Sequence, residues 1–93
     1  MTIGLLTVEL IIPSSQSLKD KRQVLRSLKD RLRNNFNISL AEIDGLDKWQ
    51  RAVIAIVKVD GKRANIDKAF AHIVGYIEKF NHIELNNYEM EML

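Results

Sequence analysis

The sequence predicts an α+β fold in which two β-α-β units form one antiparallel sheet with both helices on the same face. Two helical patterns lead to this prediction, because each follows an apolar strand and leads towards another strand. The chain has 93 residues, which suffices for one hydrophobic core but not for two. We therefore expect residues 1–93 to form a single domain.

The first half of the chain contains a strand followed by a long helix. Alternate apolar residues predict the strand at residues 3–12, and Pro13 ends it because proline offers no N–H group to a sheet. Ser17 fits the N-cap of a helix that runs to about residues 34–35. Lys21 falls on the apolar side of this helix, near its start, and we expect its stem to lie on the core while its ammonium group reaches water.

The second half repeats the order with an additional strand pairing. Alternation predicts strands at residues 38–44 and 51–59, and an apolar stripe at helical spacing predicts a helix over residues 62–80. A last strand is expected at residues 83–93, with a bulge near residues 86–87. The order β-α-β-β-α-β with right-handed crossovers is the ferredoxin-like arrangement, for which the sheet order is 4-1-3-2.

Composition excludes several classes of function. The chain has no cysteine, which excludes disulfides, thiolate catalysis and cysteine-based metal sites. No apolar run approaches the roughly 20 residues needed to span a bilayer, and no signal peptide is apparent. We therefore expect a cytoplasmic protein that has no contact with a membrane.

Positive charge is concentrated in the first helix. The net charge is only +2, but residues 19–33 hold seven of the 14 basic residues and only two of the 12 acidic residues. Five of these cations fall within a stripe roughly 80° wide at helical periodicity. They are Lys19, Arg22, Arg26, Lys29 and Arg33. Such a stripe favours contact with RNA phosphates, and the alternative is an ordinary solvated helix face.

The start of the same helix has the features of an anion site. Ser17 precedes three cations, Lys19, Lys21 and Arg22, in the first helical turns. Free backbone N–H groups and the helix dipole attract anions there. The alternative is a plain N-cap with surface lysines. No glycine is present to wrap the backbone around a phosphate, so the segment is not a P-loop.

The uncovered face of the sheet is predicted to be aliphatic. We place five residues of the first and third strands on it: Leu5, Thr7, Ile11, Ile54 and Ile56. Glu9 and Lys58 are expected to pair there across neighbouring strands. The absence of aromatic rings argues against base stacking and favours a homodimer interface. Cover by the C-terminal residues or by the hairpin loop is the alternative.

The remaining candidates are isolated residues. Trp49, with Arg51 nearby, is either a partner contact or a hydrophobic plug at the end of a hairpin, and a lone tryptophan is more often the plug. His72 and His82 have no partner pattern and are expected to be surface or cap residues. No catalytic, metal or cofactor motif is present. The sequence therefore favours a non-enzymatic module; a small-molecule regulatory domain is the less favoured alternative.

Three segments together resemble the YlxP-like family of small bacterial proteins. They are SLKDKR at residues 17–22, NISLAEID at residues 37–44 and DKWQRA at residues 47–52. The resemblance covers essentially the whole chain and implies a ferredoxin-like fold of unknown function. Members are often encoded near transcription-elongation, translation-initiation and ribosome-maturation factors. The resemblance therefore implies RNA or ribosome association, and it carries no catalytic residues.

Overall fold

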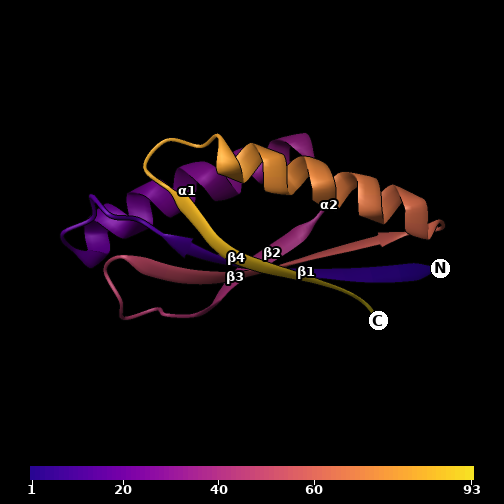
Figure 1. Ribbon diagram of the computed structural model, residues 1–93, viewed down its shortest axis with the longest axis horizontal. Coiled ribbons are helices and arrows are strands. Elements are labelled where there is room, and N and C mark those ends of the chain that lie inside the picture. The colour runs from indigo at the N-terminus through magenta and orange to yellow at the C-terminus, as the bar shows by residue number, and fades with distance from the viewer.

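The computed structural model describes all 93 residues and contains one sheet covered by two helices on one face (Figure 1). The elements are β1 (Thr2–Ile11), α1 (Leu18–Asn35), β2 (Ser39–Asp44), β3 (Arg51–Asp60), α2 (Arg63–Glu78) and β4 (Glu84–Met92). The four strands are antiparallel in the order β2-β3-β1-β4. This order is equivalent to 4-1-3-2, so the predicted ferredoxin-like fold is confirmed.

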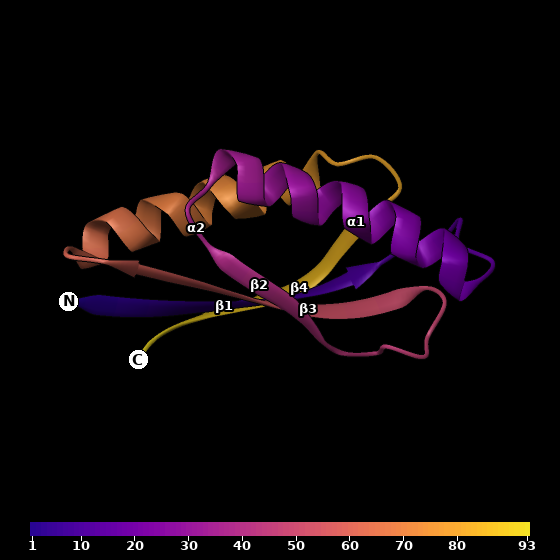
Figure 2. The same cartoon turned by 180° about the vertical axis from the view of Figure 1, so that it is seen from behind.

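The two helices lie over opposite halves of the sheet. In Figure 1 α2 and β4 are nearest the viewer, and in Figure 2, seen from behind, α1 and β2 are nearest. α2 packs against β1, β3 and β4. Neither helix is long and apolar enough to cross a membrane.

The core lies between the helices and the sheet. It contains 17 buried hydrophobic residues, which come from both helices, from β1, β2 and β3, and from Ile12 and Ile83 just outside β1 and β4. Gly4 on β1 lets α2 come close, because a Cβ at that position would lie 2.5 Å from the side chain of Ile66 and 2.9 Å from that of Phe70. The absence of a side chain at Gly4 thus sets the distance between α2 and the sheet.

The register of β3 against β1 corrects the predicted open face. Ile54 pairs with Val8 and Ile56 pairs with Leu6, and both isoleucines are buried beneath the helices. The expectation that Ile54 and Ile56 line the open face is therefore wrong. The open face carries the alternate residues instead. Those of β1 and β3 are Ile3, Leu5, Thr7, Glu9, Ile11, Arg51, Val53, Ala55, Val57 and Val59.

Two irregularities interrupt the edge strands. The register of β4 shifts opposite Glu9 and Leu10, which leaves Asn86 as the additional residue and confirms the bulge expected near residues 86–87. A second shift in β2 leaves Ile43 without a partner, and its side chain is exposed. In each case the pairing resumes beyond the additional residue, with Leu85 in β4 and with Asp44 in β2.

Candidate nucleic-acid interface

Five cations lie along one side of α1, and we call this surface the basic flank. Its residues are Lys19, Arg22, Arg26, Lys29 and Arg33. Four of these side chains are exposed, and Lys29 is half-buried. At 1.5 Å of rise per residue, the flank extends for about 21 Å along the helix. The flank therefore occupies one side of α1 over about four helical turns.

The basic flank has almost no internal counter-charge. Arg33 pairs with Asp30 at an N···O distance of 3.8 Å, and both side chains are at least half exposed. The pairing of Arg26 with Asp30 that the i,i+4 spacing suggests does not form. None of the other four cations makes an ion pair. Their charges therefore remain available to an external anion.

Lys21 does not belong to this exposed surface. Its side chain is only 1% exposed, and its Nζ donates to Glu42 Oε2 at 2.9 Å, to the Gly45 carbonyl at 2.7 Å and to the Arg51 carbonyl at 3.1 Å. These acceptors match the three donors of an ammonium group. The expectations that the ammonium reaches water and binds an external anion are both wrong. Lys21 instead fastens α1 to the hairpin between β2 and β3.

The start of α1 is a capped helix terminus. The Ser17 side chain accepts a hydrogen bond from the Asp20 N–H at 3.0 Å, which confirms the predicted N-cap. The Asp20 carboxylate in turn accepts from the Gln16 N–H at 3.1 Å. A carboxylate therefore already lies beside the N–H groups that were expected to hold an anion. Ser17 therefore caps the helix and Lys21 binds the hairpin, and the two residues do not form an anion site together.

The sheet carries an ion pair on its open face. Arg51 Nη2 lies 2.9 Å from Glu9 Oε2, and Nη1 lies 3.7 Å from Asp44. The expected pair between Glu9 and Lys58 does not form, because the register places Lys58 opposite Gly4. Hydrogen bonds from Asn86, and then from Arg51, lower the pKa of Glu9 below its ordinary value. The same pairing with Glu9 raises the pKa of Arg51.

Trp49 lies at the hairpin end, and the residue is 55% exposed. The expectation that it is a hydrophobic plug is therefore wrong, and the ring is available for contact. Its neighbour Gln50 ties the hairpin to the loop after β1, donating to the Pro13 carbonyl at 3.0 Å and the Ser15 carbonyl at 2.9 Å. These bonds join the hairpin end that carries Trp49 to the loop that precedes α1. Elsewhere, no three of the His, Asp and Glu side chains gather closely enough to hold a metal ion.

Sequence reasoning missed a second group of polar residues, between the helices. Arg31 lies on the side of α1 that faces α2, where it shares a groove with Tyr76 and Lys79 and with residues 80–82. The sequence indicates only that Arg31 lies at a helical angle well away from the basic flank. The other members come from a part of the chain about 50 residues away, so no local pattern joins them.

Comparison with known proteins identifies a family. The model of a family described as "Protein of unknown function (DUF503)" matches residues 3–90. The uncharacterized protein YlxP of Bacillus subtilis (strain 168) is 38% identical over 82 residues, which cover 88% of this chain and 89% of that protein. A solved structure of a REP-associated tyrosine transposase bound to a REP hairpin matches with a TM-score of 0.49 and 16% identity. The match covers 99% of this chain and 56% of the transposase chain.

Proposed function

This chain belongs to the DUF503 family of proteins of unknown function, and we propose that it is a non-enzymatic RNA-binding module of the cytoplasm. The observation that carries the proposal is the basic flank, in which four of five cations have no carboxylate partner. The phosphate backbone of RNA, including that of the ribosome, is the polyanion proposed to lie along α1. Binding through such a surface is salt-sensitive and weakly dependent on sequence.

The separation of charge across the fold supports this proposal. The basic flank is on α1, which Lys21 joins to the hairpin between β2 and β3. Glu84, Glu89 and Glu91 lie on β4, at the opposite edge of the sheet. The three glutamates of β4 are thus kept away from the surface that would approach phosphate, and the acidic residues of α1 itself are only Asp20 and Asp30. The unpaired cations of the basic flank therefore attract a polyanion to this side of α1.

The proposal is tested by reversing charge on the basic flank in a folded protein. Lys19, Arg22 and Arg26 are replaced together by glutamate, because all three are exposed and unpaired. Fluorescence anisotropy with labelled ribosomal RNA fragments then measures affinity over a range of salt concentrations. The matched control replaces Lys62, Arg63 and Lys68 by glutamate, which makes the same change in net charge at the N-cap and in the first turns of α2.

We expect wild-type binding to weaken steeply with salt and the flank variant to lose it. Each phosphate contact contributes about 0.7–0.9 to the slope of log K against log salt, so the flank variant should lose about 2–3 units of slope. Circular dichroism establishes that both variants are folded. Equal affinities for the two variants would contradict the proposal, because net charge rather than the position of the flank would then govern binding.

A second candidate function, homodimerisation, is favoured by the open face of the sheet. Leu5, Val53 and Val57 are half-buried there without a covering helix, and Val59 is 54% exposed. Four strands of up to ten residues give a face of about 600 Å² at ordinary strand spacings, close to the area that each partner buries in a standard interface. We infer that a second copy of this chain covers the face.

Sedimentation equilibrium tests this second function. Val57→Glu introduces a charge at the centre of the open face and should convert a dimer into a monomer without unfolding it. Lys68→Glu, on an exposed part of α2, is the control and should leave the mass unchanged. A wild-type protein that remains monomeric at high concentration would rule out the dimer while leaving the RNA proposal intact.

A further inference from the structure

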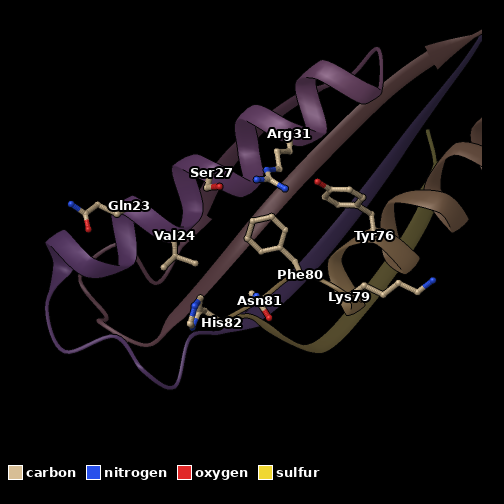
Figure 3. Close-up of a pocket in the computed structure, with 9 residues that line it drawn as sticks. All are labelled: Gln23, Val24, Ser27, Arg31, Tyr76, Lys79, Phe80, Asn81 and His82. Atoms are coloured by element: carbon tan, nitrogen blue, oxygen red, sulfur yellow. The ribbon is translucent and has the colours of Figure 1, made fainter.

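A groove of about 680 Å³ separates α1 from the end of α2 and the turn after it (Figure 3). This volume lies within the usual range for small-molecule sites, about 300–1,000 Å³. Val24, Ser27 and Arg31 of α1 face Phe80 and Tyr76 across the groove. Asn81 and His82 close one end, and Gln23 and Lys79 extend outward at the rim.

The floor of the groove is aromatic. Tyr76 and Phe80 are half-buried, with ring centroids 6.1 Å apart and planes tilted by 42°. The Arg31 guanidinium lies 5.8 Å from the centroid of the Phe80 ring. A guanidinium held over an aromatic ring offers a flat stacking surface together with N–H donors. The groove can therefore receive a flat ring beside a cation.

The rim of the groove is polar and contains no carboxylate. None of its nine lining residues is acidic, although the chain has 12 acidic residues. Arg31 and Lys79 provide two positive charges, and neither makes an ion pair. The side chains of Gln23, Ser27, Asn81 and His82 have no hydrogen-bond partner within the protein. Their donors and acceptors remain free for a bound molecule.

We propose that this groove binds a nucleotide, with the base against Tyr76 and Phe80 and the phosphate at Arg31. The chemistry recognised is an aromatic ring that carries a phosphate. Its source is either a free nucleoside monophosphate or an unpaired nucleotide of an RNA strand. This inference goes beyond the proposed function, because the groove lies on the other side of α1 from the basic flank and uses none of its residues.

His82 provides a way to separate binding from stability. Its backbone has φ of 69°, a left-handed conformation that favours glycine over residues with a Cβ. His82→Gly therefore removes the imidazole from the groove and relieves the backbone at the same position. A purely structural role for His82 predicts no loss of binding from this change. A binding role predicts weaker nucleotide affinity in a protein at least as stable as the wild type.

The test is nuclear magnetic resonance titration of the ¹⁵N-labelled full chain with AMP, GMP, CMP and UMP. Separate titrations use nucleosides, inorganic phosphate and a single-stranded RNA oligonucleotide. Arg31→Gln and His82→Gly are the groove variants. Arg63→Gln is the matched control, because Arg63 is exposed on α2 and lines no part of the groove.

We expect saturable shifts of the groove amides with a Kd below about 1 mM for at least one monophosphate. Each groove variant should weaken binding by about tenfold, the value of one charged hydrogen bond or cation–aromatic contact, and Arg63→Gln should not. Shifts with the oligonucleotide alone, lost in both groove variants, would identify the RNA strand as the source. The absence of groove shifts with all four monophosphates and with the oligonucleotide, or equal binding of phosphate alone, would overturn the proposal.

The two proposals fail separately. Replacement of Lys19, Arg22 and Arg26 by glutamate should abolish the salt-sensitive RNA affinity while monophosphates still shift the groove amides. Conversely, Arg31→Gln should weaken nucleotide binding in the groove by about tenfold and leave most of the salt dependence of RNA binding. A groove response lost only in the flank variant would overturn the proposed groove.

Discussion

Lys21 and the basic flank use the same kind of side chain on the same helix for opposite purposes. Lys21 is 1% exposed, and its ammonium group donates three hydrogen bonds to acceptors within the protein. Lys19, Arg22 and Arg26, in contrast, are exposed and make no ion pair. The difference arises from helical angle, because Lys21 shares the core side of α1 with Leu25, and the flank points away from it. Position relative to the sheet, more than residue type, decides whether a cation stabilises the fold or is available for a partner.

The largest expected effect on stability comes from removing the buried ammonium group of Lys21. Lys21→Met keeps the apolar stem but leaves the Glu42 carboxylate and two carbonyls without their donor. We expect a loss of about 3 kcal/mol in the free energy of unfolding, measured by urea denaturation. Lys19→Met is the control and should stay within about 0.5 kcal/mol of the wild type. Similar losses for both variants would refute the structural role assigned to Lys21.

A smaller loss should follow from changing the acceptor. Glu42→Gln retains an oxygen that can accept from Lys21 but removes the negative charge, and the carbonyls of Gly45 and Arg51 still hold the ammonium. We expect a loss of about 1–2 kcal/mol. Glu84→Gln, at an exposed position of β4, is the control in the same urea titration. A loss larger than that of Lys21→Met would mean that the carboxylate, rather than the ammonium, anchors the hairpin.

The partly exposed ion pair between Glu9 and Arg51 on the open face should have an intermediate effect on stability, and this effect should depend on pH. Asn86 and then Arg51 lower the pKa of Glu9 in the folded protein below its ordinary value of 4.5. The stability that this pairing contributes is fully present above pH 4.5 and is lost as pH falls through the lowered pKa of the folded state. Asn86→Ala should therefore make acid destabilisation shallower in this range, and Asn87→Ala should not. Thermal melts over this pH range measure the difference.

The smallest effect on stability is expected from a single change on the basic flank. Arg26→Gln should leave the free energy of unfolding within about 0.5 kcal/mol of the wild type, because the side chain is exposed and unpaired. If the flank lies on phosphate, the same change should reduce the salt slope of RNA binding by about 0.7–0.9. An unchanged slope in the anisotropy titration would remove Arg26 from the interface.

The order and type of the elements were determined by sequence alone. Apolar spacing of two and of about 3.6 residues identified four strands and two helices, and the crossover rule then set the sheet order. Ser17 as the N-cap and the bulge at Asn86 were also predictable, because each has a local cause. The basic flank was visible for the same reason, since all five of its residues belong to one helix.

Tertiary structure decided what depends on distant partners. β3 is apolar on both faces, so alternation alone did not choose between Ile54 and Val53, and the register with β1 placed Ile54 in the core. The acceptors of Lys21 lie 21, 24 and 30 residues further along the sequence, and no local sequence pattern predicts them. The groove at Arg31 likewise exists only because two helices meet. Local periodicity reports which residues share a face, whereas the packed fold decides whether that face is buried and what each residue on it contacts.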